Sequence, residues 1–433
     1  MASWLLGIWV GLTFCKLGNP VIFEGQTPAP TGILEAIFSS WPISWGYVLL
    51  GLVVLATLPL AEWKAKLPKY TIYLLLFWFG WQVFSTAQTT SARLSWLTVP
   101  HFGACVVSFF IGALVVSRFS NLAPVWVCLL VGFIFVCWMG IDQHFGGLER
   151  TRKEFLQMDW SQFSPELRAK LDTPEFRTKI MSERIFGTFV YANALAGGIL
   201  LLMPICLWSA WELFKWLSLA SRMFILAVVG CLGVGCLYWS GSKAGWLIAI
   251  GLVAVAFSML SLKRQTKWIF MALLILAGTA GFYTKYQGYF AKGATSATAR
   301  TDYWKAAWET AVARPILGSG PGTFSIEYKK RKSAESEMAR LAHNDYLEQA
   351  SDSGWPGFIS YAGFIIVSLT MLYRNALGTW RDKALWLGAL GLAAQSVVEF
   401  GLYIPALAWP FFLFLGWLWG NHRNRVDIPN QAA

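Results

Sequence analysis

Charged residues are scarce in this sequence of 433 residues: they make up 13% of the chain, whereas hydrophobic residues make up 56%. A soluble protein of this length carries about a quarter charged residues, so the composition excludes an ordinary soluble fold. Apolar runs of about 20 residues, the length needed to cross a hydrocarbon core, recur from one end of the chain to the other. The sequence therefore predicts an all-α, polytopic membrane protein.

Cysteine and histidine are also rare, with seven and four copies. Every cysteine lies inside an apolar segment, and no pair has the CxxC spacing of a metal site. We therefore expect neither a disulfide framework nor a metal-ligand set. The first apolar segment lacks a basic start and a small-residue cleavage site, which favours a retained helix over a signal peptide.

Hydropathy predicts about twelve membrane-spanning helices and two long loops. Helix-forming stretches occur in both loops, so we expect short helices there. A loop of this length usually has a function unless it is disordered, and the helix-forming stretches of the second loop favour function. The predicted parts are 1–141 with spans one to five, 142–187 as the first long loop, 188–284 with spans six to nine, 285–355 as the second long loop, and 356–433 with spans ten to twelve and a tail.

The basic residues of the short loops indicate the orientation. Every second short loop is basic, as at Lys64 and Lys66 after the second span or Lys263 and Arg264 after the eighth. The positive-inside rule places these loops and both termini in the cytoplasm, and the two long loops then face the periplasm. Topology and contact with anionic lipid account for much of the net charge of +12, so we expect no binding to nucleic acid.

The second long loop contains residues suited to binding an anion. Arg300 is expected to open a helix that ends before Pro315. A cation is disfavoured at a helix N-terminus, which an anionic ligand such as a phosphate would explain. The alternative is an exposed arginine bonded to a carboxylate such as Asp302. The segment Gly318–Gly322 is either a phosphate cradle or a structural turn, and the turn is favoured because the Lys-Ser/Thr of a P-loop is missing.

A second helix is predicted to begin at the sequence His-Asn-Asp, residues 343–345. In one interpretation Asn344 or Asp345 caps this helix and His343 has no special role. In the other, His343 is a general base, because histidine titrates near neutral pH. The basic run 329–332 is either a solvated helix face or a contact for a phosphorylated acceptor.

Three further polar residues lie at predicted span ends. Arg184 and Lys243 could be juxtamembrane anchors whose charges reach the interface. However, they are expected on the same side of the membrane as Arg300 and His343, which is what a diphosphate site at the lipid surface needs. Glu399 lies in or near a span, where a carboxylate is a functional candidate, unless its position is already at the outer interface.

With these motifs the chain resembles the superfamily of O-antigen ligases and O-antigen polymerases of the bacterial inner membrane. The resemblance covers about residues 184–420 and is most specific in the arginine, glycine turn and histidine of the second loop. The matching segments are GTFVYAN after Arg184, SGSKAG around Lys243, RPILGSGPGTF, HNDYLEQASDSGWPG and the closing EFGLYIPALAWPFFLFLG.

The resemblance implies a glycosyltransferase that needs no metal and no cofactor. Such enzymes move a glycan from undecaprenyl diphosphate to a hydroxyl acceptor, here expected to be lipid A-core, on the periplasmic face. By position, Arg184, Lys243 and Arg300 would bind the donor diphosphate, and His343 would accept the proton of the attacking hydroxyl. Asn193, Asn344 and Glu399 would support them. The family usually has arginine where this chain has Lys243, and lysine cannot grip a phosphate at two points.

Two alternatives remain open within and beyond this superfamily. A polymerase of lipid-linked repeat units, or a transferase to protein hydroxyls, would share the site and differ in the acceptor. A transporter or flippase of a lipid-linked glycan would be of another class. The transporter would need charged residues in the middle of many spans, and apart from Glu399 the spans hold almost none.

Overall fold

The computed structural model describes residues 1–63, 67–157, 180–291, 295–333 and 336–427. Every regular element in these parts is a helix, which confirms the predicted all-α class. The count of twelve crossings stays a prediction, because seven helical segments meet the length and hydropathy needed to span a membrane and two more apolar helices are shorter. The seven are Ile43–Leu60, Ala92–Arg118, Ala123–Gln157, Ala192–Leu213, Leu219–Trp239, Arg264–Tyr289 and Asp345–Asn375.

The helices of the first part of the chain are mostly apolar. Between α1 and α3, a short helical turn, η1, precedes the small helix α2. This first part consists of α1 (Ala2–Lys16), η1 (Val21–Gln26), α2 (Ile33–Phe38), α3 (Ile43–Thr57), α4 (Lys69–Ser85), α5 (Ala92–Leu114), α6 (Ala123–Asp142), η5 (Gln143–Gly147) and α7 (Leu148–Gln157).

The second part of the chain carries most of the polar side chains predicted to form a site. Within the first long loop, 142–187, residues 158–179 lie outside the described residues, and the described parts are 142–157, with η5 and α7, and 180–187. The remaining elements are α10 (Ala192–Leu213), α11 (Leu219–Trp239), α12 (Lys243–Ser258), α13 (Arg264–Ala291), α14 (Thr295–Ala313), α15 (Phe324–Arg331), α16 (Asp345–Asn375), α17 (Trp380–Gln395), η7 (Gly401–Tyr403) and α18 (Pro405–Asp427).

Helix α18 is the central helix of the bundle, and its residues 405–420 are all buried. Its backbone approaches that of α5 closely, because small residues line the contact. A side chain at Gly416 would come within 1.9 Å of the carbonyl oxygen of Phe109, and one at Gly112 within 2.2 Å of that of Leu413. Small residues that allow such close approach are typical of helix packing in membranes.

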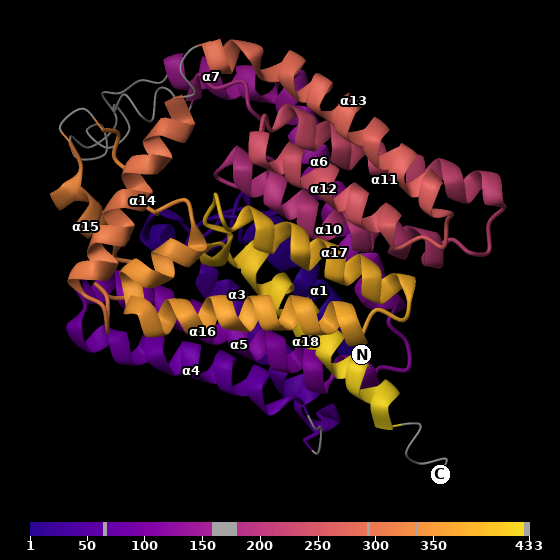
Figure 1. The fold of residues 1–433 in the computed structure, drawn as a ribbon, viewed down its shortest axis with the longest axis horizontal. Coiled ribbons are helices and arrows are strands. Elements are labelled where there is room, and N and C mark those ends of the chain that lie inside the picture. Colours follow the sequence, from indigo (N-terminus) through magenta and orange to yellow (C-terminus); the bar gives the residue numbers. More distant parts are fainter. Residues whose placement is uncertain (64–66, 158–179, 292–294, 334–335, 428–433) are drawn as a thin grey trace.

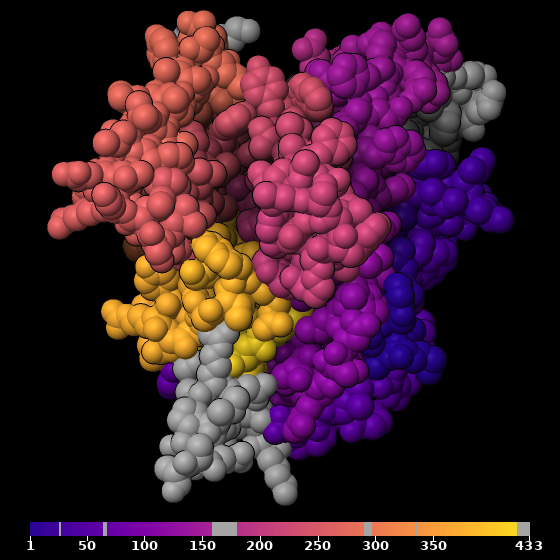
Figure 2. Space-filling view, turned by 90° about the vertical axis from the view of Figure 1, so that its right-hand side faces the viewer, coloured from indigo at the N-terminus to yellow at the C-terminus, as the bar shows by residue number. Residues whose placement is uncertain are grey.

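The polar helices α14 and α15 lie together at one end of the molecule, and the end of α18 lies at the opposite end (Figure 1). The start of α16 joins them through a small separate core made by Tyr303, Phe324 and Tyr328 with neighbouring alanines. Figure 2 views the opposite end, where pink, salmon and orange parts of the chain face the viewer. The second predicted loop is therefore a packed helical structure on one end of the bundle.

One predicted helix boundary is wrong. Helix α14 begins at Thr295, so Arg300 lies in its second turn and not at its N-terminus. The five residues before Arg300 are already part of the helix. The macrodipole argument for an anionic ligand at Arg300 therefore does not apply, and the case for Arg300 depends on its contacts.

Candidate functional site

The carboxylate of Glu399 is the centre of a hydrogen-bonded group of side chains. Glu399 lies in the turn between α17 and η7 and is only 5% exposed. Its Oε1 atom accepts hydrogen bonds from the amide of Asn193 and the guanidinium of Arg300, and Oε2 lies 3.0 Å from Nδ1 of His343. Burial raises the pKa of Glu399, but the interactions with His343, Arg300 and Arg184 outweigh burial, and the pKa lies below its ordinary value. The carboxylate is therefore ionised at neutral pH.

The first residue of α16 positions the turn that carries Glu399. The backbone N–H of Asp345 donates to the carbonyl of Ser396 at 2.8 Å and to that of Glu399 at 3.2 Å. Its carboxylate accepts the N–H of Leu402 at 2.9 Å. These three bonds hold both sides of the turn against the helix start, and His343, two residues before Asp345, consequently faces Glu399.

His343 has a fixed ring and an unusual backbone. Its φ is 51°, and it is the only residue other than glycine with positive φ in the described parts of the chain. Such conformations are uncommon and cluster at functional sites. The ring of Phe400 lies edge-on to the imidazole, with ring centres 4.7 Å apart, and the ring of Tyr303 stacks on the imidazole, with ring centres 5.8 Å apart. In the neutral imidazole, Nδ1–H donates to Glu399, which leaves the Nε2 lone pair as the proton acceptor.

Asn344 caps α16, because its side-chain oxygen accepts the N–H of Leu347 at 3.0 Å. This agrees with the capping interpretation for Asn344. Glu348 accepts the N–H of Ala342 at 2.9 Å and so fixes the other side of His343. Asn344 therefore positions the start of α16, and its side-chain oxygen is bonded to the helix backbone.

Arg184 joins the group through Asn193. Its Nη2 donates to the side-chain oxygen of Asn193 at 2.5 Å, and its Nε donates to the carbonyl of Ser240 at 2.7 Å. Gly241, with φ of 61°, follows Ser240, and a side chain there would lie 3.2 Å from Nε of Arg184. Burial lowers the pKa of Arg184, while the charge of Glu399 opposes that shift. Arg184, Asn193 and Glu399 thus form one continuous chain of polar contacts.

Lys243 lies close to this group and has no hydrogen bond to it. It is the first residue of α12, whose start is capped by Ser242. Its Nζ lies 3.8 Å from the ring centre of Tyr289 and 5.3 Å from that of Tyr286. Its electrostatic neighbours are Arg184 and Arg300. The structure therefore brings the three predicted cations together, with Lys243 held on aromatic faces.

A small hollow of about 10 Å³ lies beside Glu399 and Asn193, between α10, α17 and the start of α18, and neither the three cations nor His343 lines it. It has room for a single water. The Nε atom of Arg300 is buried and has no hydrogen-bond partner among the described residues. An anion that reached this atom would satisfy a donor that these residues leave open.

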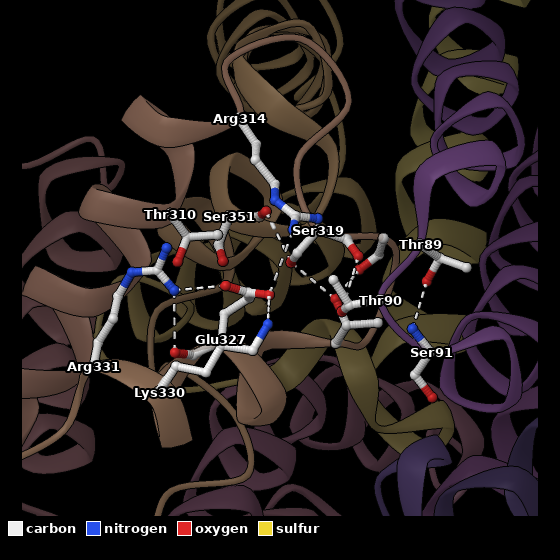
Figure 3. A network of polar contacts seen from close by, with 12 residues as sticks. Thr89, Thr90, Ser91, Thr310, Arg314, Ser319, Glu327, Lys330, Arg331 and Ser351 are labelled. Atoms are coloured by element: carbon white, nitrogen blue, oxygen red, sulfur yellow. Dashed lines mark hydrogen bonds and ion pairs between the residues drawn. The ribbon is translucent and has the colours of Figure 1, made fainter.

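The glycine-rich segment is a structural turn. The N–H groups of Ser319 and Gly320 donate to the carbonyls of Ser351 and Asp352 at 2.9 and 2.8 Å, and that of Gly322 donates to the Asp352 carboxylate at 2.6 Å. These donors are therefore already occupied by α16. Figure 3 shows Ser319 and Ser351 within a wider polar network. The interpretation as a phosphate cradle is not supported.

Two residues of the basic run 329–332, Lys330 and Arg331, form ion pairs with Glu327. The carboxylate of Glu327 is buried, and it lies 2.8 Å from Lys330, 2.6 Å from Arg331 and 3.9 Å from Arg314 (Figure 3). Glu327 thereby joins the end of α14 to α15. These ion pairs favour the structural interpretation of the run.

A large apolar cavity lies between helices of the second part of the chain. It has a volume of about 800 Å³ and is lined by residues of α10, α11, α12, α13 and α17. Trp246, one turn into α12 from Lys243, lies at its wall, and Glu212 and Lys383 also line it. The cavity is large enough for a lipid chain, and its lining extends from Trp246, close to Lys243 in the sequence, to Glu212 and Lys383 at the far ends of α10 and α17.

Two aromatic residues were missed in the sequence analysis. Tyr303 and Phe400 hold the imidazole of His343, and neither has a spacing that indicates this contact. The only signal was the position of Phe400 next to Glu399. Among the described residues, no group of three or more His, Cys, Asp or Glu side chains is placed to hold a metal ion.

Residues 229–362 match the family described as O-antigen ligase. The matched segment includes Lys243, Arg300 and His343, whereas Arg184, Asn193 and Glu399 lie outside it. The resemblance to this superfamily is thereby confirmed, and the match supports a glycan transferase of the O-antigen ligase and polymerase class. No curated protein matches the chain.

Replacement of Gly320 by alanine should destabilise the protein. Its φ is 106°, and a side chain there would lie 2.1 Å from the hydroxyl of Thr89, so both backbone and packing oppose the change. We expect a loss of about 1–3 kcal/mol, measured as a lower thermal unfolding midpoint in detergent. Gly32→Ala is the control, since nothing lies within 4 Å of that position. Equal midpoints for both variants would contradict the turn described above.

The lowered pKa of Glu399 predicts that the stability of the protein depends on pH. Its folded pKa is lowered relative to the unfolded value of about 4.3. The stabilisation is therefore present above about pH 4.3 and is lost as the pH falls through the folded pKa. Unfolding midpoints measured from pH 7 down to 3 should show Glu399→Gln less stable than wild type at neutral pH, with the difference shrinking on acidification. Glu309→Gln, an exposed carboxylate on α14, should show no such trend, and a difference independent of pH would refute the pairing.

Proposed function

We propose that the protein is a lipid-linked glycan transferase of the ligase type. The donor is a glycan on undecaprenyl diphosphate, and the acceptor is a hydroxyl of lipid A-core on the periplasmic face. The observation that carries the proposal is the contact of His343 and Arg300 with the same carboxylate, Glu399. A base for the acceptor and a cation for the donor are thereby held next to each other.

The reaction is a single displacement at the anomeric carbon. The acceptor oxygen forms a bond to this carbon, and its proton passes to Nε2 of His343. The bond from the anomeric carbon to the diphosphate oxygen breaks, and its electron pair leaves with the diphosphate. A one-step displacement inverts the configuration at this carbon. General base catalysis by a positioned histidine contributes about 10²–10⁴-fold to such a step.

The cations act on the leaving group. Arg184, Lys243 and Arg300 bind the diphosphate, whose negative charge grows as the bond to the sugar breaks. Arginine can donate to two phosphate oxygens at once, and the open Nε of Arg300 supports this role. The prenyl chain would lie in the apolar cavity of about 800 Å³, with the diphosphate at the end where Trp246 lies one turn from Lys243.

His343→Ala and Arg300→Ala should each reduce transfer by about 10²-fold or more. The measurement uses purified protein in lipid nanodiscs with an undecaprenyl-diphosphate-linked glycan and lipid A-core, and it records the rate of glycan transfer. His144→Ala is the matched control, because this histidine is exposed on η5. Because each variant removes a partner of Glu399 and so lowers the unfolding midpoint, both must be shown by circular dichroism to be folded at the assay temperature.

Full activity in both variants would refute the site. Formation of glycan chains on undecaprenyl diphosphate, with no transfer to lipid A-core, would identify a polymerase instead. Transfer to a protein hydroxyl would identify a protein glycan transferase. Movement of the donor across the bilayer without any transfer would support a flippase.

A further inference from the structure

A row of aromatic rings leads from the start of the chain to His343. The ring of Phe23 in η1 lies 6.5 Å from that of Tyr191, and Tyr191 lies 5.2 Å from Phe400. Phe400 in turn meets His343 at 4.7 Å. The three aromatic residues come from segments far apart in the sequence. Phe23 and Tyr191 are partly exposed, whereas Phe400 is 3% exposed, so the first two rings can meet a ligand and Phe400 links them to the imidazole.

Arg340 lies beside this row, three residues before His343. Its guanidinium carbon is 5.9 Å from the ring centre of Phe23, and the side chain is exposed. It has no ion pair or hydrogen bond with any described residue. Arg340 is thus a cation held over an aromatic ring, with its donors open to a ligand.

Arg340 belongs to a different neighbourhood from the cations proposed for the donor. The electrostatic neighbours of Lys243 are Arg184 and Arg300, whereas Tyr191 is flanked by the charges of Arg340 and Glu399. A ligand bound along the aromatic row would reach His343 without using the donor cations. The row and Arg340 therefore suit the second substrate.

We propose that Phe23, Tyr191 and Arg340 form the acceptor subsite, and that the acceptor is a sugar chain with an anionic group close to its reacting hydroxyl. This inference rests on the proposed function, because it assigns the second substrate of the same reaction. The apolar C–H face of a sugar packs on an aromatic ring, which supplies contact area along the row. The guanidinium of Arg340 binds a phosphate or carboxylate by charge-assisted hydrogen bonds.

The test compares two acceptors with wild-type and variant protein. One acceptor is lipid A-core with phosphorylated core sugars, and the other is the same molecule after removal of the core phosphates. Arg340→Gln should raise KM for the phosphorylated acceptor by about tenfold, the effect of one charge-assisted hydrogen bond. It should leave kcat and KM for the donor unchanged. The dephosphorylated acceptor should show the raised KM already with wild type and no further change in the variant.

Matched variants separate charge from packing. Lys305→Gln removes an exposed cation from α14 and should change neither constant. Phe23→Leu and Tyr191→Leu should raise KM for both acceptor forms, because they remove the stacking surface and not the charge. Binding of each acceptor to the inactive His343→Ala variant, with and without Arg340→Gln, repeats the comparison without turnover.

Three results would overturn the inference: an unchanged KM in Arg340→Gln, an increase that persists with an acceptor free of both phosphate and carboxylate groups, or an increase in KM for the donor. Failure of the proposed function looks different, since wild type would then transfer glycan to neither acceptor while still binding them. A carboxylate is the recognised group if an acceptor with acidic core sugars and no phosphate keeps the low KM and loses it in Arg340→Gln.

Discussion

The buried carboxylate of Glu399 is the contact on which the candidate site depends. A buried charge is costly unless it is paired and hydrogen-bonded, and this one has partners from three other segments of the chain: Asn193 on α10, Arg300 on α14 and His343 before α16. Removal of one partner would leave the carboxylate of Glu399 with fewer of the contacts that offset the cost of its burial. The positions of base and cation are therefore coupled, and the group is assembled only when α10, α14, α16 and the turn after α17 are all packed.

The start of α16 supports both the site and the glycine turn. Asp345 holds the turn that carries Glu399, and Asp352, two turns later, holds the backbone of Gly320 and Gly322. The first two turns of α16 thereby hold the glycine turn that follows α14 and the turn before α18 in fixed positions relative to each other. A site built on helices is more precise than one built on a free loop, and this explains why the second polar segment is packed instead of extended.

The sequence could predict the class of fold because a membrane helix requires little more than an apolar run of sufficient length. It also pointed to Arg300 and His343 as candidates, because they are unusual residue types at one predicted side of the membrane. It could not identify Glu399 as the centre, since this depends on contacts across 99 residues to Arg300 and 206 residues to Asn193. The start of α14 was misplaced because Thr295, Ser296 and Thr298 are all residue types that can cap a helix, so the sequence does not determine where before Arg300 the helix begins. The glycine turn was ambiguous for a related reason: only the packed structure determines whether its N–H groups are free or already bonded to α16.

The charges of the group favour the diphosphate that leaves the sugar in the proposed reaction. Arg184, Lys243 and Arg300 provide three positive charges, and Glu399 offsets one of them. The remaining charge attracts the diphosphate in the ground state. When the bond to the sugar breaks, the diphosphate gains a further negative charge, and the same cations bind it more strongly. An interaction that grows along the reaction lowers the barrier, whereas one that is constant only tightens binding. Glu399 thus prevents the cations from repelling one another before the donor arrives, and a more highly charged anion can then compete for Arg300 as it leaves the sugar.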